Sequence, residues 1–290
     1  MRRRALRTLT AAVTAVLLAA GASACSGQAD DGRPAAAVPS PAPTATATPD
    51  PFPTEPLSSG TRYVALGDSF AAGMGGGDEQ GKCRTSPHSY PSVFTKEAGV
   101  DLIVNAACAG ATTGDLLRRQ LIAIDDRTDL ITLSIGGNDL GVAAVAADCS
   151  AGKAVACRNE LSSALSLLDV LPQRLSTVYS AVAQAAPNAR IVVTGYVVMY
   201  DPGSTSGKDF GLRTAINAAT VGLNQVIEDA VDAQRAKGVP MEFVRVDFAG
   251  HLLGDRDPWI NQTGADAFHP TAEGYAQYAK TLVKELGTAE

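Results

Sequence analysis

Four short segments of the chain carry side chains that could perform acyl-transfer chemistry. Ser69 ends the tripeptide Gly67-Asp68-Ser69, which directly follows an apolar run. A serine hydroxyl is a weak nucleophile near neutral pH and needs a positioned base, most often a histidine. Taken alone, a serine in such a turn is better explained as the cap of the following helix. Ser69 therefore becomes a candidate nucleophile only together with the other segments.

One of the three histidines has a carboxylate at a useful spacing. His269 follows Asp266 by three residues in the segment DAFHP. In a turn, this spacing lets the carboxylate accept a hydrogen bond from Nδ1–H and leaves Nε2 to face a serine. His88 lies in a polar loop, and His251 has no acidic neighbour at a comparable spacing. We expect Asp266 and His269 to activate Ser69; the alternative is a turn-capping aspartate beside a partly buried histidine.

Two further segments could supply hydrogen-bond donors to an oxygen that becomes negative. In CAGA, Gly110 has no side chain to obstruct the approach of a ligand to its N–H. In GGND, the glycines free the turn and Asn138 offers a side-chain amide. An asparagine after paired glycines is more often a turn former. Its position at the end of a predicted strand favours the donor role.

The elements that must position these residues can be read from the apolar pattern. Five runs rich in β-branched residues predict strands that are buried on both faces. Helical stretches lie between them, so the pattern indicates a doubly wound, three-layer α/β/α domain with a five-stranded parallel sheet. Its site is expected beyond the carboxyl ends of the strands. The runs begin at Arg62, Asp101, Asp129, Ala189 and Met241, and the helices are expected over 113–124, 159–186 with a break near Pro172, 210–237 and 271–286.

Three regions divide the chain. Residues 1–25 combine arginines, an apolar run and small residues, the pattern of an export signal, and Cys25 follows in a context that resembles the lipobox of bacterial lipoproteins. We expect Cys25 to carry a lipid anchor, with plain secretion as the alternative. Residues 26–60 are rich in Pro, Ala and Thr and predict a disordered tether. Residues 61–290 are long enough for one domain.

Charge and cysteine content exclude several partners. The formal net charge is −6, and the predicted signal holds arginines but no acidic residue, so a nucleic-acid partner is not expected. Without Cys25, an even number of cysteines remains in an exported chain, which favours disulfides over a metal site. We favour the sequence-near pairs Cys83–Cys108 and Cys149–Cys157. The scattered histidines and the lack of an HExxH motif argue against zinc.

In this order, the four segments resemble the blocks of the SGNH, or GDSL, hydrolase superfamily, from about Tyr63 to the last predicted helix. The segments ALGDSFAAG, CAGATT and SIGGND are most similar to secreted lipases and esterases of actinobacteria. The resemblance implies a flavodoxin-like strand order, 2-1-3-4-5. It also implies that the backbone N–H of Ser69, the N–H of Gly110 and the side chain of Asn138 form an oxyanion hole. Asp266 and His269 would complete the triad, although some of these relatives orient the histidine with a backbone carbonyl.

The resemblance implies hydrolysis of carboxylic esters through an acyl-enzyme, without a cofactor. Two alternatives stay open at this point: an esterase that removes acyl groups from polysaccharides, and a surface lipoprotein that keeps the fold but only binds. Trp259, in DPWIN, either lines the site or packs in the core. The Cys149–Cys157 pair lies away from the four segments in the sequence, so we expect it to support stability more than turnover.

Overall fold

A computed structural model describes residues 52–53, 55–203 and 210–288 of the chain. The predicted signal at 1–25, the candidate anchor Cys25 and most of the predicted tether at 26–60 lie outside these described residues.

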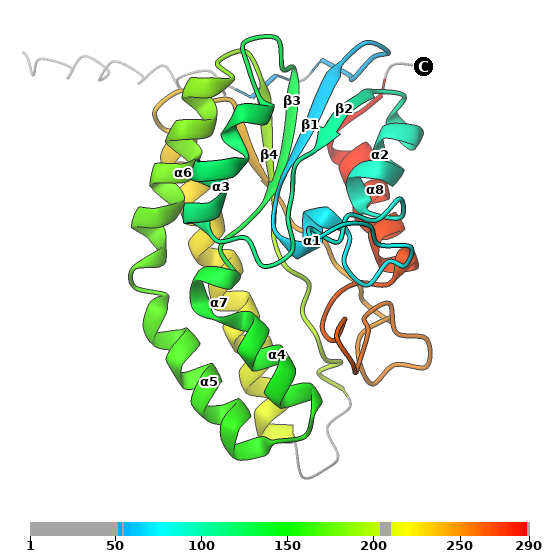
Figure 1. The fold of residues 1–290 in the computed structure, drawn as a ribbon, viewed down its shortest axis with the longest axis vertical. Helices are drawn as coiled ribbons and strands as arrows, with labels where there is room; N and C mark the ends of the chain where they lie inside the picture. Colours follow the sequence, from blue (N-terminus) through cyan, green and yellow to red (C-terminus); the bar gives the residue numbers. More distant parts are fainter. Residues whose placement is uncertain (1–51, 54, 204–209, 289–290) are drawn as a thin grey trace, which may run out of the picture. The chain divides into compact units, whose positions relative to one another are not determined.

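Five parallel strands form one sheet in the order β2-β1-β3-β4-β5. Hydrophobic residues pair in a row across the sheet, with Val64 beside Ile131, Ile131 beside Ile191 and Ile191 beside Met241. Helices cover both faces, so the predicted three-layer fold and strand order are confirmed (Figure 1). The strands are β1 (Arg62–Gly67), β2 (Asp101–Asn105), β3 (Leu130–Ser134), β4 (Arg190–Thr194) and β5 (Met241–Val244).

The sequence predicted strands that are buried on both faces, but β2 is partly exposed. Every residue of β3 is buried, whereas Ile103 and Val104 of β2 are 46% and 38% exposed. The difference follows from position, because β2 is an edge strand with a single neighbour. A continuous apolar run therefore did not distinguish a central strand from an edge strand.

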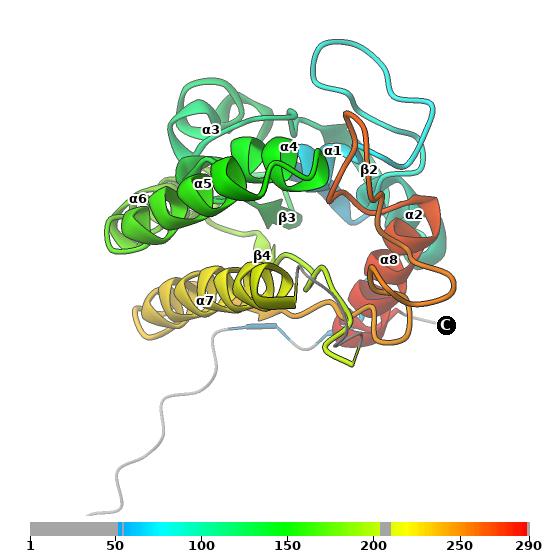
Figure 2. The ribbon, with the colours of Figure 1, turned by 90° about the horizontal axis from the view of Figure 1, so that it is seen from below.

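The helices form two layers, visible when the sheet is viewed along its edge (Figure 2). One face carries α2 (Tyr90–Ala98) and α8 (Ala272–Leu286), which meet where the rings of Tyr90 and Tyr278 stack at 5.4 Å. The opposite face carries α3 (Thr113–Arg119), α6 (Leu171–Ala185) and α7 (Phe210–Arg235). The predicted site lies between these layers, beyond the carboxyl ends of β1, β2 and β3.

The helical stretch predicted over 159–186 is divided near Pro172, as expected, into two helices, α5 (Ala154–Leu167) and α6, and it begins five residues earlier than predicted. Pro172 falls in the first turn of α6, where a missing N–H breaks no helical hydrogen bond. Before α5 lies α4 (Val142–Ser150), an alanine-rich helix that the sequence analysis missed, and α1 (Ser69–Ala72) is a single turn. Short 3₁₀ turns occur at η1 (Leu121–Ala123) and η2 (Asn138–Leu140).

The domain begins before residue 61, so the predicted end of the tether at residue 60 is wrong. Phe52 and Leu57 are 9% and 4% exposed and belong to the core. The guanidinium of Arg190 lies 4.9 Å from the centroid of the Phe52 ring, and Leu57 N donates to the carbonyl of Gly287 at 3.1 Å. Two apolar side chains in a proline-rich segment suffice to hold it against the domain.

Disulfides join Cys83 to Cys108 and Cys149 to Cys157, the pairs favoured from the sequence. The first connects the loop before α2 to the turn after β2. The second joins α4 to α5 across a short turn and clamps the two helices into a hairpin.

Leu57→Ala tests the revised start of the domain. We expect the free energy of unfolding to fall by about 2 kcal/mol, because the substitution removes a buried side chain and leaves a cavity. Urea unfolding followed by circular dichroism measures the change. Ile122→Ala is the matched control, since Ile122 is 93% exposed. Equal free energies of unfolding for the two variants would show that residues 52–60 belong to the predicted tether and not to the folded domain.

Candidate active site

Ser69 lies at the tip of a sharp turn between β1 and α1. The turn requires a glycine before it: Gly67 has a φ of +133°, and a Cβ there would lie 2.2 Å from the carbonyl oxygen of Ser134. Asp68 then caps α1 by accepting a hydrogen bond from Phe70 N at 3.0 Å. This geometry presents the Ser69 hydroxyl to a cavity at the carboxyl edge of the sheet, although the residue is only 8% exposed.

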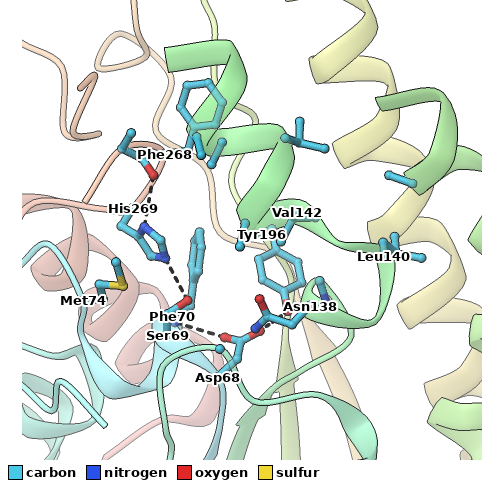
Figure 3. Close-up of a pocket in the computed structure, with 18 of the residues that line it drawn as sticks. Asp68, Ser69, Phe70, Met74, Asn138, Leu140, Val142, Tyr196, Phe268 and His269 are labelled. Atoms are coloured by element: carbon cyan, nitrogen blue, oxygen red, sulfur yellow. Dashed lines mark hydrogen bonds between the residues drawn. The ribbon is translucent and has the colours of Figure 1, made fainter. Parts of the chain in front are cut away.

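His269 lies beside this hydroxyl, in a position to act as its base. Its Nε2 lies 2.8 Å from Ser69 Oγ, across 200 positions of sequence (Figure 3). The ring is delivered by the loop before α8, in which Phe268 adopts a left-handed φ of +67°. Asn261 fixes this loop by accepting from Phe268 N at 2.8 Å and donating to the carbonyl of His269 at 2.9 Å. The first and last of the four predicted segments are thus brought together.

The second ring nitrogen of His269 does not bond to Asp266, so the predicted geometry of the triad is wrong. Nδ1 lies 3.1 Å from the carbonyl oxygen of Ala267 (Figure 3). A carbonyl can only accept, so Nδ1 carries the proton and Nε2 of the neutral ring is free to accept from Ser69. The carbonyl of Ala267 therefore fixes the proton on Nδ1 of His269, which is the tautomer that the carboxylate of Asp266 was expected to fix.

Asp266 is bonded elsewhere because a permanently charged donor lies close to it. Arg84 Nη2 donates to Asp266 Oδ1 at 2.6 Å and also lies 3.7 Å from Glu79 Oε1. Asp266 still acts on the histidine through space, since its charge raises the pKa of His269 while Arg84 lowers it. Burial is the largest effect and holds the pKa of His269 below its ordinary value of 6.5. The imidazole is thereby kept neutral at neutral pH.

Three donors converge on the cavity beside Ser69. Within the described part of the chain, no acceptor engages the backbone N–H of Ser69 or of Gly110. Gly110 has a φ of +80°, and the space where a Cβ would stand is open. Asn138 begins η2 and donates one amide hydrogen to the carbonyl of Ala111 at 3.1 Å, which orients the amide and leaves the other hydrogen for a ligand. This set can stabilise an oxyanion.

A buried network that the sequence analysis missed supports this arrangement. The carboxylate of Asp68, 1% exposed, accepts hydrogen bonds from Phe70 N, the hydroxyl of Tyr196 and Ser134 Oγ. The hydroxyl of Tyr196 in turn accepts from Gly137 N at 3.0 Å. Burial raises the pKa of Asp68 to about 6, against the lowering effect of these donors. The signal available in the sequence was a polar residue, Tyr196, just beyond the end of a fourth strand.

A cavity of about 540 Å³ opens beside Ser69 and runs between α4, α5 and α7. Its wall is mostly aliphatic on the side of the helices. Lys82 and Arg84 line it near the histidine. The helical wall consists of Val142, Ala143, Val145, Ala146, Ala147, Leu161, Ala164, Leu165, Leu168, Ile216, Ala219, Thr220 and Leu223.

Neither Cys149 nor Cys157 lines the cavity, but their disulfide joins the two helices that do. It ends the hairpin that starts four residues after Asn138 and lines the cavity. Trp259 does not line the cavity; it stacks on His251 at 3.5 Å and packs edge-on against Phe248. His88 lies 3.1 Å from Asp78 and has no role in the site.

Comparison with known proteins relates the chain to lipases of Streptomyces. Residues 65–277 match the GDSL-like Lipase/Acylhydrolase family. Lipase 1 of Streptomyces coelicolor is 38% identical over 223 residues, which cover 73% of this chain and 81% of that protein. An extracellular lipase from Streptomyces rimosus, solved by crystallography, is 36% identical with a TM-score of 0.69, covering 77% of this chain and 99% of that one. A phospholipase A1 structure from Streptomyces albidoflavus also has a TM-score of 0.69, at 34% identity, over 78% and 99% of the two chains.

These matches confirm the resemblance to actinobacterial lipases, and they rule out the alternative of a protein that only binds. With a serine, a neutral histidine and three donors at one cavity, the chain belongs to the GDSL-like lipase/acylhydrolase family and is a carboxylic ester hydrolase.

Proposed function

We propose that Ser69 and His269 act as a catalytic dyad on esters with an apolar acyl group. The observation that carries the proposal is the 2.8 Å contact between Ser69 Oγ and Nε2 of a buried, neutral histidine, at the end of an apolar cavity. The aliphatic wall favours such a substrate over the acetyl groups of polysaccharides, because a small acyl group would leave most of the wall uncovered.

In the proposed mechanism, Nε2 of His269 accepts the hydroxyl proton as Ser69 Oγ attacks the ester carbonyl carbon. The carbonyl oxygen becomes negative and receives hydrogen bonds from Ser69 N–H, Gly110 N–H and Asn138 Nδ2. His269 then protonates the leaving alcohol, and an acyl-serine ester remains. Water, deprotonated by His269, attacks this ester, releases the carboxylic acid and restores Ser69. No cofactor enters any step.

Asp266 has a supporting role in this proposal. Its carboxylate raises the pKa of His269 from a distance and is shared with Arg84, so it stabilises the imidazolium less than a direct partner would. The Ala267 carbonyl holds the ring. Catalysis by a serine–histidine pair with a carbonyl as the third member requires only that the proton on Nδ1 stays fixed.

We further propose that the chain is exported and that Cys25 carries its lipid anchor. Support comes from the arginine-rich, apolar start of the sequence, the two disulfides, and the extracellular location named for the Streptomyces rimosus lipase. Among the residues that the structure describes, no helix has the length and hydropathy needed to cross a bilayer.

Ser69→Ala should abolish ester hydrolysis and labelling by a fluorophosphonate, with little change in melting temperature, because the hydroxyl is placed for attack rather than for packing. Asn138→Ala should keep labelling but lose about 10²–10³ in kcat, the usual effect of removing one oxyanion donor. The assay is hydrolysis of p-nitrophenyl esters. Wild-type turnover by Ser69→Ala would refute the mechanism, and a loss below about threefold would exclude Asn138 from the oxyanion hole.

The pH dependence of kcat/KM distinguishes the effects of Asp266 and Arg84 on the pKa of His269. Activity requires the neutral imidazole, so it falls as the pH drops through the pKa of His269, and the midpoint should lie below 6.5. Asp266→Asn removes a charge that raises this pKa, so the midpoint should move to lower pH with less than about a tenfold loss of activity. Arg84→Gln should move it to higher pH. If Asp266→Asn lost as much activity as His269→Ala, Asp266 would be a third member of a catalytic triad with Ser69 and His269.

Cys25→Ser tests the anchor. We expect the variant to release active enzyme into the medium, since the described domain has its own core and holds Ser69, His269 and the proposed oxyanion donors. Activity is measured in washed membranes and in culture supernatant. Equal membrane retention of the wild type and the variant, with no lipid on Cys25 by mass spectrometry, would contradict the proposal.

A further inference from the structure

Helix α4 is held in place by little of the core. It has 9 residues, and of these, all of which the structure describes, only Val145 is buried. Its N-cap is Gly141, which provides no side-chain hydrogen bond. Helices of this length are marginal on their own. The position of α4 must therefore depend on its partner, α5.

The Cys149–Cys157 disulfide ties the two helices together at the end of α4. The Cα atoms of the pair are 4.8 Å apart, and Cys157 is fully buried. An ion pair between Lys153 and Asp148, at 3.0 Å, crosses the same turn but is exposed to solvent. An exposed ion pair contributes little, so the disulfide and the apolar packing of Val142, Val145 and Ala146 keep α4 against α5, and the disulfide is the covalent link between the two helices.

One face of α4 borders the cavity with small side chains. Ala143, Ala146 and Ala147 line it, and of these Ala146 is half-buried while Ala143 and Ala147 are exposed at its mouth. Ala144 is also exposed but lies outside the lining. The other walls carry larger residues, among them Leu161 of α5. The volume of the cavity thus depends on alanines at this face, since a larger side chain on α4 would project into it.

The chemistry of the Ser69–His269 dyad assigns the part of the cavity beside α4 to the acyl group of the substrate. His269 must protonate the leaving oxygen, so the alcohol lies on the histidine side, where Lys82 and Arg84 line the cavity. The acyl chain then leaves the carbonyl carbon on the other side. In that direction Asn138, Leu140 and Val142 lead from the reaction centre to α4 (Figure 3).

We propose that the α4–α5 hairpin, clamped by Cys149–Cys157, is the wall that selects the acyl chain, and that the alanines at 143, 146 and 147 admit medium and long aliphatic acyl groups. This inference rests on the proposed function of Ser69. Each methylene that the wall covers contributes about 0.8 kcal/mol, which corresponds to a rise of about fourfold in kcat/KM. The rise should continue along a series of p-nitrophenyl esters from acetate to dodecanoate and stop where the cavity is filled.

Ala146→Phe and Ala144→Phe form a matched pair on one helix. With Ala146→Phe, the ratio of kcat/KM for dodecanoate to that for acetate should fall at least tenfold, because the ring occupies the space of the chain. With Ala144→Phe, the ratio should stay within about twofold of the wild type. Ala147→Leu gives a smaller intrusion should the phenylalanine variant fail to fold. Equal ratios in the wild type, Ala146→Phe and Ala147→Leu would overturn the inference.

The disulfides provide a second comparison. Cys149→Ser with Cys157→Ser should lower the same ratio, because a loosened hairpin covers long chains less well. Cys83→Ser with Cys108→Ser should lower turnover of all esters by a similar factor, since that bridge adjoins Gly110. Fluorophosphonate labelling of Ser69 is measured in the wild type and in every variant. A wild-type protein that is not labelled would refute the proposed dyad. A Cys149–Cys157 variant that is labelled and has an unchanged ratio of kcat/KM values would refute only the role of the hairpin.

Discussion

The carboxylate of Asp68 is the group on which the geometry of the site depends. A carboxylate buried at 1% exposure is tolerated only when donors satisfy it, and here they come from three separate elements: Phe70 N, Ser134 Oγ and the hydroxyl of Tyr196. The hydroxyl of Tyr196 also receives Gly137 N–H, one residue before Asn138. The turn that carries the nucleophile and the turn that carries an oxyanion donor are thus fixed to one buried charge. Displacement of either would leave polar groups without partners.

A second set of contacts, separate from the hydrogen bonds of Asp68, supports the position of His269. Its loop is held by Asn261 and by the carbonyl of Ala267, and the charged pair Arg84 and Asp266 lies beside it. The two sets of contacts meet at the contact between Ser69 and His269 and where the ring of Phe70 lies 5.5 Å from that of His269. Since the Cys83–Cys108 bridge joins the loop of Arg84 to the turn of Gly110, it links the support of the histidine to that of the oxyanion hole.

Local apolar patterns predicted the parallel sheet and its helical layers, and the rule that parallel strands end at one edge predicted that Ser69, Gly110 and Asn138 lie close together. The strand order and the place of His269 beside Ser69 came from the resemblance to the SGNH superfamily. The sequence could not predict that Asp266 would bond to Arg84, since that contact joins residues 182 positions apart through a loop with no periodic pattern. The same limit hid Tyr196. Alanine-rich α4 was missed because nearly all of its residues are small or apolar, so its sequence, VAAVAADCS, shows no alternation of apolar and polar faces.

The contact of Leu57 with the end of α8 shows at which end of the domain the described chain enters. His269 lies just before α8, and the helix of 15 residues rises about 22 Å from there to the point where Leu57 N meets Gly287. The chain therefore enters the domain at the pole opposite the dyad. A tether that reaches the domain at this point would attach at the far end from the cavity and would leave the mouth of the cavity uncovered.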